Sequence, residues 1–220
     1  MKNLIYNRTK SFIEAVPKGV KVLAAAKKRD AAEVLEAIRA GIKIIGENYV
    51  QEAQAKRPLV NADVSWHMIG SLQKNKVKKA IQIFDVVETV DSIDLADCIE
   101  KECAKLNKNI CVMVEVNIAR EPQKAGIFPE RLKKVVEFII KCRHLRLIGL
   151  MAMGSLTDNK DILHKHFKEV RNLFYDIKET FSLNSSFEYL SMGMSSSYDI
   201  AIQEGANLVR IGTAIFGPRE

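Results

Sequence analysis

Short runs rich in β-branched residues alternate with longer helical stretches along almost the whole chain, and this alternation constrains the fold more than any other feature. Each run has the length and residue types of a strand, and the stretch that follows has apolar residues at helical spacing. Such alternation is typical of a parallel sheet. Eight strands are predicted: Val20–Ala26, Ile42–Glu47, Ser65–Ile69, Val86–Val90, Cys111–Asn117, Arg146–Met151, Glu188–Met192 and Leu208–Ile211.

An amphipathic helix is predicted over residues 1–16, and further helices lie between the strands. This arrangement fits an α/β fold, a single (β/α)8 TIM barrel with an extra N-terminal helix, as one domain over residues 1–220. A doubly wound open sheet would usually carry a glycine-rich first turn, but residues 26–30 here read Ala-Lys-Lys-Arg-Asp. The intervening helices are predicted at Ala31–Ala40, Val50–Lys56, Gln73–Ile83, Ser92–Leu106, Pro129–Cys142, Ile162–Phe181 and Ser197–Glu204.

Composition narrows the classes of function. The net charge of +7 invites an acidic partner, and residues 73–79 are the densest basic stretch. No aromatic residues are interspersed among these lysines, so a solvated helix face is favoured over nucleic-acid binding. The chain has neither an 18-residue apolar run nor a signal-peptide core, which predicts a cytoplasmic protein with no membrane partner. The four cysteines form no C-x-x-C pair, and His164 and His166 would point apart on a helix, so no metal site is predicted.

In a closed barrel the chemistry lies at the carboxyl ends of the strands, and Lys27 follows the first of them. Leu23, Ala25 and Lys27 alternate onto one face, so the lysine can point inward past small neighbours that leave room for a ring. A lysine amine in such a restricted place can form a Schiff base. The alternative is a surface lysine in a loop, since Lys28 follows directly.

Arg210 lies in the apolar strand Leu-Val-Arg-Ile-Gly, where Val209 and Ile211 take the opposite face. If those two pack against helices, the guanidinium faces the barrel interior and needs an acceptor there. The acceptor could be a carboxylate of another strand, such as Glu115. It could equally be a ligand, and a pyridine nitrogen fits because arginine does not give up its proton.

The ends of the seventh and eighth strands predict an anion-binding region. Backbone N–H groups of Gly193, Met194, Gly212 and Thr213 and nearby hydroxyls are available to phosphate oxygens, and barrels often bind phosphate after these two strands. Other rim residues are less distinctive. His67 in the third strand is either a satisfied core histidine or a contact to a cofactor.

Six ordered blocks extend these observations over nearly the whole chain: residues 22–27, 46–52, 66–76, 149–153, 191–195 and 209–217. In these blocks the sequence resembles the YggS/PROSC family of pyridoxal phosphate homeostasis proteins, whose fold resembles the N-terminal barrel of bacterial alanine racemase. The family commonly has valine and serine before its lysine and threonine after it, where this chain has Ala25, Ala26 and Lys28. Ala125 likewise replaces a more usual serine.

The resemblance implies pyridoxal 5′-phosphate (PLP) as the cofactor, with Lys27 as the aldimine lysine. It also implies Asn48 near the cofactor ring, Arg210 at the pyridine nitrogen, and residues 191–195 and 212–213 around the phosphate. The predicted cofactor-binding set is Lys27, Asn48, His67, Met153, Ser191, Gly193, Met194, Ser195, Arg210, Gly212 and Thr213.

Two functions are compatible with this set. One is a carrier that holds PLP and supplies it to apo PLP-dependent enzymes. The other is an amino-acid racemase, which needs acid/base groups on both faces of the cofactor. Resembling racemases take their second base from an additional domain of a partner subunit, and this sequence ends directly after the eighth strand, with Tyr49 as a lone candidate base. We therefore expect a monomeric carrier with no catalytic residues.

Overall fold

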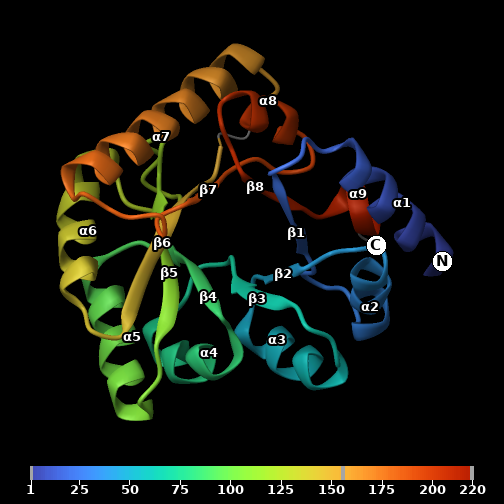
Figure 1. Ribbon diagram of the computed structural model, residues 1–220, viewed down its shortest axis with the longest axis horizontal. Coiled ribbons are helices and arrows are strands. Elements are labelled where there is room, and N and C mark those ends of the chain that lie inside the picture. Colours follow the sequence, from blue (N-terminus) through green and yellow to red (C-terminus); the bar gives the residue numbers. More distant parts are fainter. Residues whose placement is uncertain (1, 155–156, 219–220) are drawn as a thin grey trace.

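The computed structural model describes residues 2–154 and 157–218. Its strands form a closed parallel barrel in chain order, and β8 pairs with β1 (Figure 1). This confirms the predicted TIM barrel, with every strand end within two residues of expectation. The strands are β1 (Lys21–Ala25), β2 (Ile44–Glu47), β3 (Ser65–Met68), β4 (Val86–Val90), β5 (Ile110–Val116), β6 (Leu145–Ala152), β7 (Tyr189–Ser191) and β8 (Leu208–Ile211).

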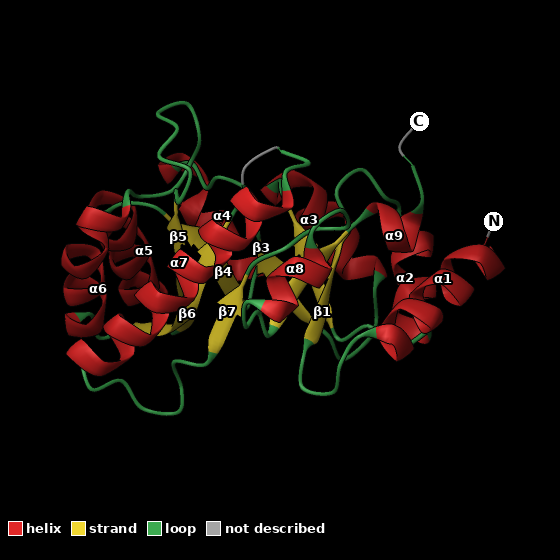
Figure 2. Ribbon diagram, turned by 90° about the horizontal axis from the view of Figure 1, so that it is seen from above, coloured by secondary structure: helices red, strands yellow, loops and turns green. Residues whose placement is uncertain are grey.

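Helices surround the barrel, and the extra N-terminal helix packs against α2 and α9 (Figures 1 and 2). The α-helices are α1 (Lys2–Ala15), α2 (Ala31–Arg39), α3 (Val50–Lys56), α4 (Val77–Ile83), α5 (Ile93–Leu106), α6 (Leu132–Lys141), α7 (Lys160–Thr180), α8 (Tyr198–Gln203) and α9 (Thr213–Phe216). Short 3-10 turns, η1 (Arg57–Leu59), η2 (Lys74–Lys76) and η3 (Pro129–Arg131), precede or follow some of them. The short helix α9 and the turn η1 were not predicted.

A capping box starts α2 just after the turn that carries Lys27. The Asp30 carboxylate accepts from the Glu33 N–H at 2.8 Å, and the Glu33 carboxylate accepts from the Asp30 N–H at 2.9 Å. Two otherwise unpaired backbone donors are thereby satisfied. Gly41, with φ +119°, follows the end of the helix, where a glycine accommodates the left-handed backbone. The capping box fixes the start of α2 at Ala31, so the turn between β1 and α2 is short.

The barrel has an inner and an outer apolar layer, set by strand parity. Alternate residues such as Leu23 face inward, whereas Ala24 and Ala26 pack outward against helices. The inner cluster consists of Leu23, Ile44, Val86, Met113, Ile148, Met151 and Leu208. Because this interior is largely aliphatic, the polar groups buried on the strands are exceptions that require partners.

Several absences hold for the described residues. None of the helices there is long and apolar enough to cross a membrane. Residues 2–154 and 157–218 contain no group of three or more His, Cys, Asp or Glu side chains that could hold a metal ion. All four cysteines are free thiols, and burial raises the pKa of Cys103 and Cys142 to about 11.

Candidate functional site

A cavity of about 330 Å³ opens at the carboxyl end of β8, and we call it the cup. Its volume falls in the usual range for small-molecule sites. Five residues of the predicted set line it together, and Ala25 and Ser196 add to them. The lining residues are Ala25, Met194, Ser195, Ser196, Arg210, Gly212 and Thr213.

Two turns form the cup. Gly193 has φ +91°, and a Cβ there would lie 2.6 Å from the Ala201 Cβ, so only glycine lets this turn pack against α8. The Gly193 carbonyl accepts from the Arg210 N–H at 3.1 Å. Ser195 Oγ accepts long hydrogen bonds from the N–H groups of Gly212 (3.3 Å) and Ala214 (3.4 Å). The turns after β7 and β8 are thus held side by side.

Arg210 is 4 % exposed, and both of its terminal nitrogens donate hydrogen bonds to protein oxygens. Its NH1 donates to the Ser191 carbonyl (2.9 Å) and hydroxyl (2.8 Å), and its NH2 donates to the Ala152 carbonyl (2.9 Å). Burial lowers the pKa of Arg210, opposed by the charges of Glu88 and Glu115, and the group remains a cation. Among the described residues no carboxylate lies within ion-pair distance, so Glu115 acts on Arg210 through its charge and is not its direct partner.

A buried hydrogen-bond chain continues inward from Arg210. Ser191 Oγ donates to Glu88 Oε2 at 2.7 Å, and His67 Nδ1 donates to Glu88 Oε1 at 2.6 Å. Burial alone would raise the pKa of Glu88, but the hydrogen bond and charge of His67, the charge of Arg210 and the bond from Ser191 lower it. Glu88 is therefore a buried carboxylate bonded on both oxygens.

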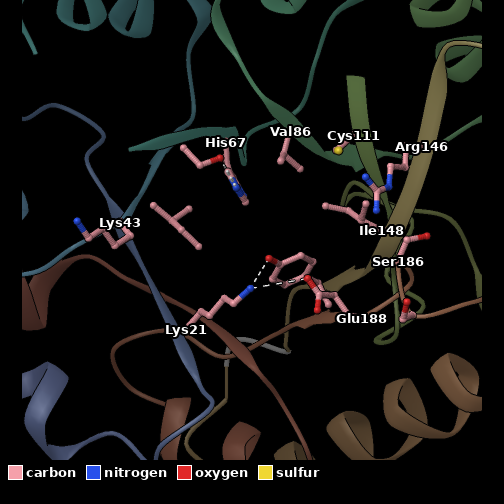
Figure 3. A pocket seen from close by; sticks show the side chains of 13 residues that line it. Lys21, Lys43, His67, Val86, Cys111, Arg146, Ile148, Ser186 and Glu188 are labelled. Atoms are coloured by element: carbon pink, nitrogen blue, oxygen red, sulfur yellow. Dashed lines mark hydrogen bonds and ion pairs between the residues drawn. The ribbon is translucent and has the colours of Figure 1, made fainter. Parts of the chain in front are cut away.

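His67 does not line the cup. It lines a different cavity at the amino-terminal end of the barrel, where Figure 3 shows its ring projecting inward. It is 3 % exposed, and its Nε2 lies 3.1 Å from Ser65 Oγ. The structure thus gives His67 the surroundings of a satisfied core histidine, connected to the cup only through Glu88 and Ser191.

Glu115 is a second buried carboxylate on the inner face of the barrel. Its Oε2 has no hydrogen-bond partner among the described residues. The pKa of Glu115 is raised to about 7. Burial is the main cause, and the charges of Asp91 and Glu88 also raise the pKa, whereas the charge of Arg210 lowers it. Near neutral pH this carboxyl group is therefore partly protonated, which spares the barrel an unpaired buried charge.

Lys27 follows β1 on the same rim as the cup. Ala24 pairs with Ile211, which brings Ala25 level with Gly212 and puts Lys27 two residues beyond that level. Lys27 is half-buried, whereas Lys28 is exposed and has φ +60°. Because β1 ends at Ala25, the exposure of the two side chains, and not strand parity, distinguishes Lys27 from Lys28.

Lys56 stabilises the turn after β1 that carries Lys27 and Lys28. Its Nζ donates to the Ala26 carbonyl at 2.9 Å, to Glu47 Oε1 at 2.6 Å and to Glu52 Oε2 at 3.2 Å. Glu52 Oε2 also accepts from the Lys28 N–H at 2.8 Å. Burial raises the pKa of Glu47 to about 7, although the bond and charge of Lys56 lower it. A buried ion cluster therefore sets the backbone that carries Lys27.

Asn48 and Met153 lie on the rim but outside the cup. Asn48 is half-buried after β2, and its carbonyl would be 2.3 Å from a Cβ on Gly70, so only glycine allows the two loops to approach. Met153 is 40 % exposed after β6.

Sequence reasoning missed Glu88 and Lys56. Glu88 had a usable signal, because a lone charged residue in the apolar run Val-Val-Glu-Thr-Val is the same pattern that singled out Arg210. Lys56 had no such signal, since Glu52 and Lys56 at i and i+4 read as an ordinary surface pair.

The groups of the rim fit a small phosphorylated ring compound. Hydroxyls and N–H groups of the cup suit phosphate oxygens, and a buried guanidinium suits a ring acceptor. Lys27 carries a primary amine on the same rim, outside the residues that line the cup.

Comparisons with known proteins agree with this chemistry. Residues 4–220 match the family described as "Alanine racemase, N-terminal domain". A pyridoxal phosphate homeostasis protein of Aquifex aeolicus is 36 % identical over 201 residues, covering 91 % of this chain and 87 % of that protein. One of Pseudomonas aeruginosa is 38 % identical over 205 residues, covering 93 % and 86 %.

Solved structures are similar too. PipY of Synechococcus elongatus, with PLP bound, superposes with a TM-score of 0.89 at 31 % identity, covering 97 % of this chain and 100 % of that one. Alanine racemase of Bacillus anthracis superposes with a TM-score of 0.78 at 18 % identity, covering 99 % and 56 %. The latter likeness shows the barrel fold alone.

Proposed function

Because this chain belongs to the family of pyridoxal phosphate homeostasis proteins, we propose that it binds PLP at the cup and Lys27 and takes part in holding and supplying this cofactor. The cup is the observation that carries the proposal. It combines hydroxyls, glycine turns and the buried guanidinium of Arg210 in about 330 Å³, on the rim that also carries Lys27.

Each group has a distinct role. When bound, PLP would supply an aldehyde, and Lys27 would provide the primary amine that holds it. Ser195, Ser196 and Thr213 would hold the phosphate through hydroxyl and backbone donors. Arg210 would face the ring nitrogen as a donor that does not transfer its proton.

The cup favours a carrier over an amino-acid racemase. A racemase needs acid/base groups on both faces of the cofactor. Apart from Arg210, the described residues that line the cup are hydroxyl, methionine, alanine and glycine residues, which make poor acid/base groups at neutral pH. Tyr49, 50 % exposed at the start of α3, is the rim residue that the racemase alternative would use. Sustained turnover of amino acids by the pure protein would support that alternative.

Borohydride trapping tests the proposal directly. Protein purified with PLP should show a visible absorbance band that borohydride abolishes, and peptide mass mapping should place the pyridoxyl group on Lys27. Lys27→Ala should lose the adduct, whereas the matched variant Lys28→Ala should keep it. An adduct on Lys28, or none in the wild-type protein, would contradict the proposal.

A further inference from the structure

A second cavity, of about 470 Å³, opens at the amino-terminal end of the barrel, and we call it the lower cavity (Figure 3). It lies at the starts of the strands, opposite the rim that carries the cup. Its lining residues are Lys21, Lys43, Ile44, Ser65, His67, Val86, Cys111, Arg146, Ile148, Ser185, Ser186, Glu188 and Tyr189.

The charge of the lower cavity is positive. Lys21, Lys43 and Arg146 line it, with Glu188 as the carboxylate among the lining residues. Lys21 lies 3.7 Å from Glu188 and 4.3 Å from the centre of the Tyr189 ring. Within residues 2–154 and 157–218, the side chains of Lys43 and Arg146 have neither a hydrogen bond nor an ion pair; Lys43 bonds only through its backbone, to the Ser65 N–H. Two cations at this mouth are therefore not neutralised by any described side chain.

Arg146 is the group best placed to receive an anion. Figure 3 shows it on the wall of the lower cavity beside Cys111 and Ile148, across from Lys21. Cys111 and Arg146 are register partners in β5 and β6, and both line this cavity. The guanidinium fork has five donors and binds a carboxylate or phosphate through two of them.

The floor of the lower cavity is apolar. Ile44, Val86 and Ile148 belong to the inner cluster of the barrel, and the Tyr189 ring packs beside them. A bare inorganic ion would leave this floor unused, whereas a ligand with an apolar body would cover it. A cation would be repelled by the basic groups, and Glu188 is exposed and already shared with Lys21.

We propose that the lower cavity binds a small oxyanion with an apolar body, a carboxylate or a phosphate monoester, whose head group bonds to Arg146. Its body lies on the aliphatic floor. Lys21 and Lys43 supply attraction from the mouth. The site is independent of the proposed PLP function, because none of its lining residues lines the cup.

Titration calorimetry with simple probes tests this site. Protein that has been incubated with PLP and reduced with borohydride, and in parallel protein that has not, is titrated with phenyl phosphate, with benzoate and with neutral phenol. At least one anion should bind saturably at one site per chain, and phenol should not. Binding of one anion alone supports the site and identifies its head group. If neither anion binds saturably, the proposal is wrong.

Arg146→Gln should lower the affinity for the anion about fivefold or more, because it removes charge-assisted hydrogen bonds at a half-open site. The matched control is Arg143→Gln, because Arg143 lies three residues earlier at the same end of the barrel but does not line the lower cavity. It removes the same charge and should change the affinity less than about twofold. Equal weakening by both variants would indicate general charge attraction and overturn the proposal. Lys21→Met should also lower the affinity for the anion.

Discussion

Arg210 and Glu88, near the carboxyl end of the barrel, are almost fully buried and bonded in a chain, whereas the side chains of Lys43 and Arg146, at the amino end, are exposed and have no partner among the described residues. The same interior thus handles charge in two ways. Buried charges must be satisfied by the protein, so their positions are fixed at a cost in desolvation. Exposed charges remain hydrated and free to meet a ligand. The carboxyl end should therefore dominate stability, and the amino end should be tolerant to change.

Arg210→Ala gives the largest expected effect. It removes three hydrogen bonds and leaves Glu88 buried with less compensation, so the free energy of unfolding should fall by about 3–5 kcal/mol. Urea denaturation followed by circular dichroism measures this. Arg146→Ala at the opposite end should cost less than about 0.5 kcal/mol. A similar loss of free energy of unfolding in both variants would contradict the proposed difference between the two ends of the barrel.

Glu88→Gln should cost about 2–3 kcal/mol. The amide has a donor where the carboxylate accepted on both sides, so it faces a donor from either His67 or Ser191. The same denaturation assay applies. Ser191→Ala serves as a partial control, since it removes one link and leaves the charge. An unchanged midpoint in Glu88→Gln would show that the carboxylate is not the centre of the chain.

Glu115 predicts a pH dependence. Its pKa is about 7 in the folded protein against 4.5 when free, so the fold favours the protonated form. The stability from this group is fully present below about pH 4.5 and is lost as the pH rises through 7. Glu115→Gln should raise the free energy of unfolding at pH 8, on the order of 2 kcal/mol, and change little at pH 4. The exposed carboxylate in Glu188→Gln is the control at the other end. Equal slopes against pH in wild type and Glu115→Gln would refute the assignment.

Lys28→Gly should give the smallest effect. Its φ of +60° is unfavourable for a side chain, so glycine should raise the free energy of unfolding by up to about 1 kcal/mol. Lys28→Ala loses the same side chain but keeps the Cβ and should bring no gain. Thermal unfolding distinguishes the two. A gain in both variants would attribute the effect to charge.

The barrel and much of the cup could be predicted because they follow from local patterns. Strand alternation predicts the number of strands, and strand parity predicts that Arg210 faces the barrel interior. The destination of His67 could not be predicted in this way. Parity indicates that it faces inward, but whether the ring reaches the cup or the opposite end depends on Glu88, which lies 21 residues away.

The burial of Lys56 was equally out of reach. Its partner, the Ala26 carbonyl, lies 30 residues earlier, and only the tertiary fold brings them together. Local spacing explains the pair with Glu52 but not that with Glu47. The positions of the reactive rim therefore depend on tertiary contacts that have no counterpart in the local pattern.

The strand β7 is three residues long and meets β8 at one registered position, Ser191 opposite Leu208. The pairing of β7 with β8 is therefore short, and residues that follow both strands line the cup at their carboxyl ends. A ligand bound in the cup would contact both strand ends and stabilise their pairing. Loss of the ligand should therefore increase amide hydrogen exchange in β7 and β8 more than in β5 and β6.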